Sequence, residues 1–215
     1  MRKLFMIALT AFTFATASAQ ASSGLYVPEL KNPTWSFEGF FGRYDDAQLR
    51  RGFQIYNEVC ATCHSLKLVS YRNLADLGFS EAEIKEIASQ KSVRLPHNEL
   101  GAELHAAGEF LTRPAAPFDR FVPPFPNDAA AKDANGGALP PDLSLIAKAR
   151  KGGPEYVYSF LTGFVEEIPE EISSQHGFVE NSEKNFNLYF PGYYNSMPPQ
   201  IADEMVEYAD GTEAT

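Results

Sequence analysis

The segment Cys60-Ala61-Thr62-Cys63-His64 constrains this chain more than any other part of its sequence. Cys-x-x-Cys-His is the attachment motif of c-type haem. Two thiols at this spacing lie on adjacent turns at a helix start, so both can add to the two vinyl groups of one porphyrin. The histidine that follows is held under the ring, where its imidazole can bind the iron. The motif predicts one covalently attached haem c, bound by Cys60 and Cys63, with His64 as an axial ligand.

Two other kinds of site also use a Cys-x-x-Cys pair. A thioredoxin-like redox motif needs a βαβ setting, and the surrounding sequence shows no such pattern. A zinc site needs further cysteines to complete its tetrahedron, but the chain has only Cys60 and Cys63. Because a haem would use both thiols, no cysteine is left for a disulfide. A packed core and the bound cofactor must therefore stabilise the domain.

The N-terminus has the features of a secretory signal peptide. Arg2 and Lys3 give it a positive start, and residues 4–17 form an apolar, uncharged run that is too short to span a membrane. Small residues around Ala19 offer cleavage sites. We predict a signal peptide over residues 1–21, the alternative being an uncleaved membrane anchor. Export agrees with the haem motif, because haem is attached to c-type cytochromes on the outer side of the membrane.

Residues 22–215 are predicted to form a single domain, which begins with an extended, aromatic arm over residues 22–44 that packs on the core. Asp45 and Asp46 can cap a helix that runs to about His64, because apolar residues recur there at three- and four-residue steps. Further helices are expected at 80–89, 143–151, 154–163 and 201–208, with a short helix or turn at 71–78. Repeated prolines predict long loops at 91–142 and 172–199. The expected fold class is mainly α, with long irregular loops.

The formal net charge of −10 excludes one class of partner. An acidic surface repels nucleic acid and steers cationic partners toward the protein. The same charge also serves plain solubility, so it does not identify a partner by itself.

A six-coordinate haem iron needs a second axial ligand opposite His64, and methionine or histidine is the usual choice. The candidates that remain after removal of a signal peptide are Met197, Met205, His97, His105 and His176. Met205 falls inside the last predicted helix, where a methionine more often fills a core. Met197 precedes two prolines that stiffen the backbone and could hold a thioether against the iron. We predict Met197 as the sixth ligand, with a histidine as the alternative.

A methionine ligand would decide the chemistry of the iron. A thioether raises the reduction potential, and a closed six-coordinate iron leaves no site for oxygen or peroxide. The predicted activity is outer-sphere electron transfer, with no catalytic site of the chain's own. An alternative from another class is a haem enzyme or gas sensor with an open iron site, which requires that Met197 does not bind.

Longer blocks of sequence resemble the cytochrome c1 family, the haem subunits of ubiquinol–cytochrome c oxidoreductase (respiratory complex III). The resemblance covers nearly the whole chain after the signal peptide. The matching blocks, in chain order, are Arg50–Tyr56 leading to Val59-Cys60, Tyr71-Arg72, Pro123–Asn127, Ala138–Ser144, Ala149–Val157, Leu161–Phe164, Tyr189–Gly192, Met197–Pro199 and Glu207–Thr212. Several such blocks in one order are far more specific than Cys-x-x-Cys-His alone.

The resemblance implies a mainly α, cytochrome c-like haem domain with long irregular loops, and it implies roles for particular residues. His64 and Met197 would be the axial ligands, and Pro140 and Pro141 would lie beside the haem. Arg150 would pair with a haem propionate, because a guanidinium binds a carboxylate with two hydrogen bonds. Tyr156 would pack near the haem.

The resemblance also implies partners and a location. Electrons would pass from the Rieske iron–sulfur protein through this haem to a soluble cytochrome c, with cytochrome b as the membrane neighbour. The location would be the periplasmic side of the bacterial inner membrane. The alternative is a free periplasmic c-type cytochrome that serves another oxidoreductase.

The chain departs from the family at its end. Family members continue into another helix and a C-terminal membrane anchor, whereas this sequence stops at Thr215 with no apolar stretch of spanning length after the signal peptide. We expect a truncated sequence, and membrane association through the complex and the missing anchor.

Overall fold

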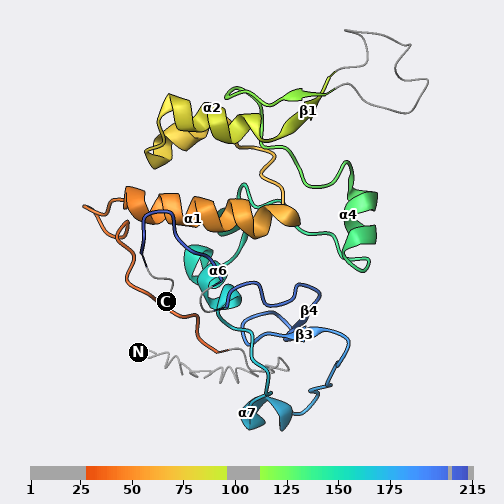
Figure 1. Cartoon of the computed structure of the whole chain (residues 1–215). Helices are drawn as coiled ribbons and strands as arrows, with labels where there is room; N and C mark the ends of the chain where they lie inside the picture. Colours follow the sequence, from red (N-terminus) through yellow and green to blue (C-terminus); the bar gives the residue numbers. More distant parts are fainter. Residues whose placement is uncertain (1–27, 96–111, 203–204, 213–215) are drawn as a thin grey trace, which may run out of the picture.

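The structure, a computed structural model, describes residues 28–95, 112–202 and 205–212. Within these ranges the domain is mostly helical, with two small two-stranded sheets and long irregular connections (Figure 1). The predicted mainly α fold class is therefore confirmed. None of the helices in the described ranges is long and apolar enough to cross a membrane. The predicted signal peptide, residues 1–21, lies outside these ranges.

Helix α1 (Asp46–Glu58) leads into the Cys-x-x-Cys-His segment. Its N-cap is Asp45, as predicted, because the Asp45 carboxylate accepts a hydrogen bond from the backbone N–H of Gln48 at 3.1 Å. The helix ends six residues before His64, earlier than predicted, and a single 3₁₀ turn, η1 (Cys60–Thr62), follows it. The backbone N–H groups of Cys63 and His64 both bond to the carbonyl of Cys60, which winds the motif tightly.

The 3₁₀ helix η2 (Tyr71–Leu77) and helix α2 (Glu81–Ser89) confirm two further predictions. The capping box that opens α2 is formed, because Ser80 accepts from the Glu83 N–H at 3.3 Å and Glu83 accepts from the Ser80 N–H at 2.7 Å. Gly78 ends η2 in the left-handed conformation, with φ of 80°.

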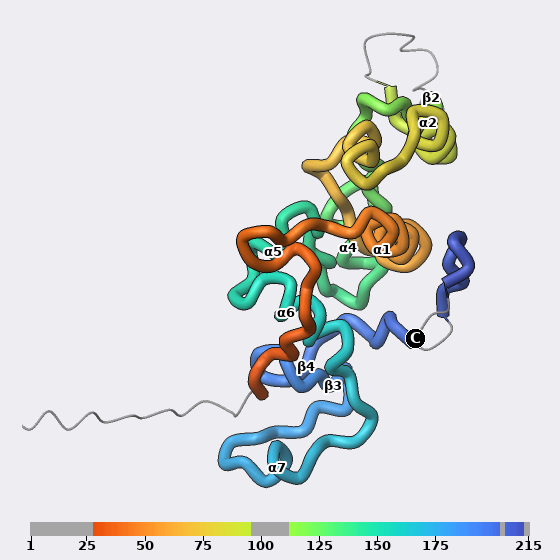
Figure 2. Tube along the Cα trace, turned by 90° about the vertical axis from the view of Figure 1, so that its left-hand side faces the viewer, coloured from red at the N-terminus to blue at the C-terminus, as the bar shows by residue number. Residues whose placement is uncertain are grey.

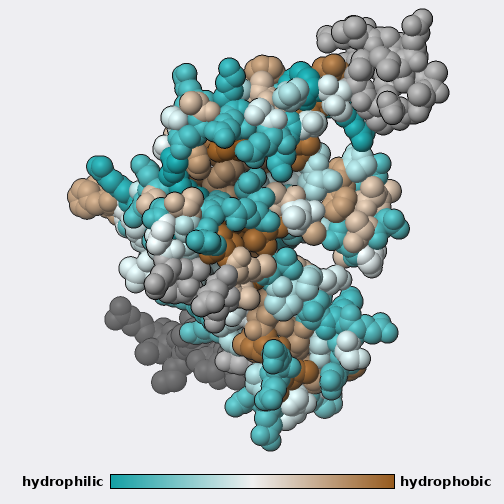
Figure 3. All heavy atoms as spheres, in the orientation of Figure 1, coloured by the Kyte–Doolittle hydropathy of each residue, from teal (hydrophilic) through white to brown (hydrophobic). Residues whose placement is uncertain are grey.

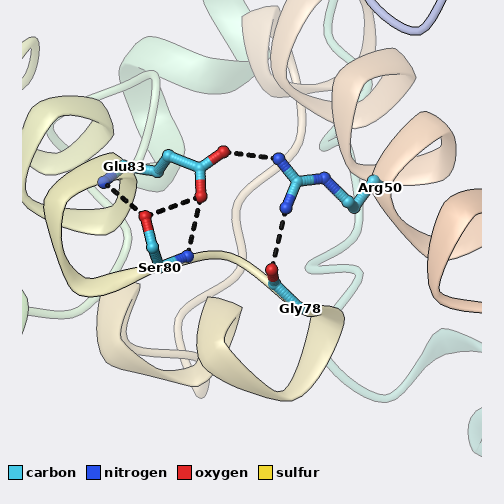
Figure 4. Close-up of polar contacts among 4 residues, drawn as sticks. All are labelled: Arg50, Gly78, Ser80 and Glu83. Atoms are coloured by element: carbon cyan, nitrogen blue, oxygen red, sulfur yellow. Dashed lines mark hydrogen bonds and ion pairs between the residues drawn. The ribbon is translucent and has the colours of Figure 1, made fainter.

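Arg50 of α1 joins this capping box to the first helix (Figure 4). Its guanidinium lies 2.5 Å from the Glu83 carboxylate, donates to the carbonyl of Gly78 at 2.8 Å and stacks 4.0 Å from the ring centroid of Phe79. The hydrogen bonds from the Ser80 N–H and hydroxyl, together with that from Arg50, lower the pKa of Glu83 to about 2. The bridge fixes α1 relative to α2.

A buried cluster, the first core, lies between α1, η2 and α2. Its buried members are Tyr71, Leu74, Ile84, Ala88, Ala115 and Phe121. The Tyr71 ring stacks on Phe121 with centroids 4.4 Å apart, and the α1 residues Phe53 and Tyr56 pack against the cluster. Because α1 is seated on this core, the core also positions the cysteines that follow α1.

The stretch 91–142 is more regular than the predicted loop. Strand β1 (Ser92–Arg94) pairs antiparallel with β2 (Thr112–Pro114), and helix α4 (Asp128–Ala134) follows. The side chain of Asn127 caps α4 by accepting from the Ala130 N–H at 2.9 Å. The prediction of one long loop was wrong because Pro114 is accommodated at the end of β2, and the other described prolines of the stretch lie outside the strands and α4.

The elements of the second half of the chain are α5 (Ile146–Ala149), α6 (Gly153–Leu161), α7 (Glu170–Ser173) and the antiparallel strands β3 (Asn185–Phe186) and β4 (Tyr194–Asn195). In Figure 1 the strands β3 and β4 and the short helix α7 lie in the lower part of the molecule, with α6 above them. Helix α5 is shorter than predicted, whereas α6 carries the expected Pro154 in its first turn. The β3–β4 hairpin lies in the stretch predicted to be loop, and a second small core forms around Ile172, Phe186 and Tyr193.

Within the described part of the arm, residues 28–44, Lys31 and Trp35 contact α6. Phe40 and Phe41 are 95% and 88% exposed, so the prediction that the arm packs on the core holds only in part. The backbone N–H of Lys31 donates to the hydroxyl of Ser159 at 2.8 Å, and the indole of Trp35 donates to Glu155 at 3.2 Å. Figure 2 shows this red-orange segment running beside α5 and α6.

The helix predicted over 201–208 was wrong, because the described residues of this stretch are irregular. Residues 207–210 instead dock on α1. Arg51 forms an ion pair with Asp210 at 2.8 Å, and the Gln54 side chain bonds to the carbonyl of Glu207 and the N–H of Ala209. The two bonds from Gln54 occupy a backbone carbonyl and a backbone N–H that would form hydrogen bonds within a helix.

Candidate haem-binding site

Cys60 begins the η1 turn just after α1, and Cys63 is the C-cap of that turn. Both are free, half-buried thiols. Burial raises the pKa of the Cys60 thiol above its ordinary value. The hydroxyl of Thr62 donates to the carbonyl of Val59 at 2.7 Å and stiffens the turn between the two cysteines. Two free thiols and an adjacent imidazole are the donor set that a covalent haem requires, so the residues present fit that group.

The His64 ring is oriented by a distant segment. Its Nδ1 lies 2.8 Å from the carbonyl oxygen of Pro141. A carbonyl can only accept, so Nδ1 carries the proton and Nε2 keeps its lone pair. This is the tautomer in which an imidazole binds a metal through Nε2, with its other nitrogen held by a hydrogen bond.

Asp142 joins the Pro140–Ser144 segment to the chain just after His64. One carboxylate oxygen accepts from the Lys67 N–H at 2.7 Å and from the Ser65 hydroxyl at 2.8 Å. The other accepts from the Ser144 N–H at 3.0 Å. Burial by itself would raise the pKa of Asp142, but these donors outweigh it and hold the pKa at about 2.

Asp142 was not among the site residues predicted from the sequence. A local signal was present, because an Asp two residues before a Ser commonly accepts from the backbone N–H of that residue. The long-range partners, Ser65 and Lys67, carry no such signal, since they are more than 70 positions away in the chain.

Arg150 and Tyr156 lie close enough to influence each other. Arg150 is exposed at the end of α5, where its guanidinium donates to the carbonyl of Ala149 at 3.4 Å. Tyr156 is half-buried on α6. Burial raises the pKa of the Tyr156 phenol, and the nearby charge of Arg150 acts in the opposite direction. The structure therefore brings these two predicted site residues together.

Met197 follows strand β4 and is half-buried. The hairpin before it is tied to the end of α6, because the Asn187 side chain donates to the carbonyl of Phe160 at 2.7 Å and the Leu188 N–H donates to the carbonyl of Gly163 at 2.9 Å. Within the described residues, no hydrogen bond or ion pair joins 196–199 to the Cys60–His64 segment.

The other candidates for the sixth ligand differ in their surroundings. Met205 is 49% exposed and does not lie in a helix. His176 is exposed in the turn after α7. His97 and His105 lie outside the described residues. Met197 stays the predicted sixth ligand, since it alone of the described candidates is partly buried in a stiffened loop.

Hydrophobic residues gather on one face of the molecule around these segments. Figure 3 shows them in the centre of the view, between α1 and the β3–β4 hairpin, with hydrophilic residues around them. Leu139 and Leu145, which flank the Pro140–Ser144 segment, are 43% and 56% exposed. Apolar side chains of this kind suit the edge of a porphyrin ring.

A mainly α domain in which Cys-x-x-Cys-His directly follows the first long helix belongs to the class of c-type cytochromes. Comparison with known families is more specific. The chain belongs to the cytochrome C1 family, whose model matches residues 35–215. Membership of this family implies a haem cofactor and a part in electron transport.

Relatives from bacteria and plants agree. The chain is 49% identical over 207 residues to "Cytochrome c1" of Rhodospirillum rubrum, covering 92% of this chain and 73% of that protein. It is 43% identical over 208 residues to "Cytochrome c1 1, heme protein, mitochondrial" of Arabidopsis thaliana, covering 96% and 62%. It is 40% identical over 202 residues to "Cytochrome b/c1" of Bradyrhizobium diazoefficiens, covering 84% and 28%. The chain therefore spans only part of the length of each relative.

Proposed function

We propose that this chain is the c-type haem electron-transfer subunit of a ubiquinol–cytochrome c reductase complex. It takes electrons from the Rieske iron–sulfur protein and passes them to a soluble cytochrome c. The observation that carries the proposal is the His64 imidazole, oriented by the Pro141 carbonyl with Nε2 left available, next to two free thiols in a chain of the cytochrome C1 family.

The chain's own residues divide the work of holding the cofactor. Cys60 and Cys63 would anchor it covalently, and His64 and Met197 would be the ligands of its iron. Pro140, Pro141 and Tyr156 would pack against it, and Arg150 would pair with a propionate. The bound haem supplies a one-electron iron couple, which suits transfer of single electrons between proteins.

The partners and the location belong to the same proposal. One relative carries the printed name cytochrome b/c1, which supports cytochrome b as the neighbour in the membrane. The predicted signal peptide supports export to the periplasmic side of the bacterial inner membrane. Expression of the full-length gene in its host tests this assignment. Co-purification with cytochrome b and a Rieske protein is expected, whereas a haem protein purified without them would favour a free periplasmic cytochrome.

Replacing Met197 with leucine tests the axial ligand. Wild type and Met197→Leu, each expressed with a haem-attachment system, are both expected to give a covalent c-type spectrum, since Cys60, Cys63 and His64 are unchanged. The methionine–iron absorption band should vanish in the variant, and its reduction potential should fall by on the order of 100 mV. Optical spectra of both oxidation states and a redox titration measure these changes.

Met205→Leu is the matched control and should leave both the band and the potential unchanged. A Met197→Leu spectrum identical to that of wild type would move the ligand to Met205 or a histidine. A wild type that lacks the band would favour the alternative of an open iron site.

A further inference from the structure

The orientation of His64 depends on a residue that cannot anchor itself. Pro141, whose carbonyl bonds to His64 Nδ1, follows Pro140, and neither proline has a backbone N–H with which to fix its position. Pro141 is also 77 positions away from His64 in the chain, so no local structure joins the two. The next residues along the chain, Asp142 and Leu143, must therefore hold the Pro141 carbonyl in place.

Asp142 makes this attachment with both carboxylate oxygens. One oxygen accepts from Ser65 and Lys67, directly after His64, and the other accepts from the Ser144 N–H. The attachment continues on either side, because the Leu143 N–H donates to the Ser65 carbonyl at 2.9 Å and the Leu68 N–H donates to the Ser144 hydroxyl at 3.0 Å. These hydrogen bonds form a two-sided link between residues 65–68 and 142–144, which we call the Asp142 staple.

The staple uses neutral donors throughout. Within the described parts of the chain, Asp142 has no ion pair, and the ammonium group of Lys67 lies instead 3.9 Å from the carboxylate of Asp128. The carboxylate has four lone-pair positions and no donor of its own, so it matches a ring of N–H and O–H donors. A side chain with a single acceptor oxygen at this position would leave either the Lys67 or the Ser144 backbone N–H without a partner. An unpaired buried N–H costs more free energy than one hydrogen bond contributes to stability.

We propose that Asp142 is a positioning residue for the axial imidazole. By stapling the Pro141 carbonyl against His64, it keeps the Nδ1–H hydrogen bond formed and thereby fixes both the tautomer and the plane of the ring that presents Nε2 to the iron. The inference rests on the proposed function, since it requires a haem bound through His64.

Asp142→Asn is the sharpest test, because it keeps the size of the side chain and replaces one acceptor oxygen with the NH2 group of an amide. In either orientation of the amide this NH2 group faces a donor, so either the Lys67 N–H or the Ser144 N–H loses its partner. Asp128→Asn is the matched control. It removes the same charge next to the same Lys67, but Asp128 is 69% exposed and takes no part in the staple.

The measurement is hydrogen exchange of the His64 Nδ1–H, followed by NMR in the reduced haem protein. Exchange is expected to be about tenfold faster in Asp142→Asn than in wild type, and unchanged in Asp128→Asn. The backbone N–H of Tyr71, a residue of the first core, donates to the carbonyl of Asp119 and should keep its protection from exchange. Such a pattern separates a loosened histidine from a general loss of stability. The reduction potential should also shift more in Asp142→Asn than in the control. Both variants lose one negative charge, so the difference between their shifts reports the loss of the staple.

The outcomes distinguish this inference from the proposed function. Unchanged exchange in Asp142→Asn, with covalent haem and the methionine band intact, overturns the role of Asp142 and leaves the proposed function standing. A wild type that attaches no haem overturns both. If Asp142→Asn does not accumulate, Ser65→Ala removes one donor and keeps the charge. Faster exchange in that variant supports the staple, and exchange equal to wild type overturns it.

Discussion

Replacing Gly163 with alanine is expected to destabilise the domain by about 3 kcal/mol, the upper part of the range for an overpacked site. A Cβ at this position would lie 2.5 Å from Cδ2 of Tyr189 and 2.6 Å from the backbone oxygen of Ser159. It would also lie 3.1 Å from Oδ1 of Asn187. All three neighbours belong to buried residues, so none can move away without disturbing its own packing.

We expect Gly163→Ala to affect the predicted methionine ligand, Met197, as well as the stability of the domain. Gly163 lies two residues after α6, where Asn187 and Leu188 bond to Phe160 and to Gly163 itself and so tie the β3–β4 hairpin to the end of that helix. Met197 lies two residues beyond β4. We therefore expect Gly163→Ala to weaken the methionine–iron band in addition to lowering the midpoint of urea unfolding, measured on the haem protein by circular dichroism.

Gly52→Ala supplies the control for this experiment. Gly52 lies in the middle of α1, and a Cβ there would meet no atom within 4 Å. Alanine is the better helix former, so this variant should be as stable as wild type or more stable by up to about 1 kcal/mol. An unfolding midpoint of Gly163→Ala equal to that of Gly52→Ala would show that the close approach at Gly163 has no energetic consequence.

The elements that sequence reasoning predicted correctly are those defined by short-range chemistry. The Asp45 cap, the Ser80 capping box and the Pro154 start of α6 each depend on groups within about one helical turn. The β1–β2 pair and the β3–β4 hairpin were missed because each depends on pairing between short segments with little periodicity. Helix α4, capped by Asn127, was missed because several prolines lie close to it and proline-rich sequence indicates a loop.

The final predicted helix failed for a different reason. Residues 201–208 have a helical pattern of apolar positions, but their polar groups find better partners on α1, where Gln54 bonds to the backbone on both sides of Tyr208. Tertiary contacts of this kind override a weak local preference.

In the candidate site, too, short-range features were predicted from the sequence and long-range contacts were not. The local motif and the family resemblance brought Cys60, Cys63, His64 and Pro141 together, and the structure gives the hydrogen bond that joins the last two. The part played by Asp142 depends on two segments more than 70 residues apart, which no spacing rule relates. Sequence reasoning therefore predicted which groups would touch a haem, whereas the residues that hold those groups in place could be found only from the fold.

Replacing Tyr71 with alanine is expected to cost about 4 kcal/mol, the largest loss we predict for a single residue. Tyr71 is only 2% exposed, and its ring stacks on Phe121 with centroids 4.4 Å apart. Removing the ring would leave a cavity in the first core, against which Phe53 and Tyr56 of α1 are packed. Because Tyr56 also donates to the backbone carbonyl of His64 at 3.3 Å, the cavity would loosen the haem motif together with the core.

Tyr71→Phe separates the ring from its hydroxyl. Among the described residues, the hydroxyl accepts one long hydrogen bond, from the Val122 N–H at 3.4 Å, so its loss should cost about 1 kcal/mol or less. Urea unfolding of the three haem proteins gives both differences directly. Equal stabilities for Tyr71→Ala and Tyr71→Phe would mean that the ring is not what fills the first core, and that α1 is positioned chiefly by its polar links to α2 through Arg50 and Glu83.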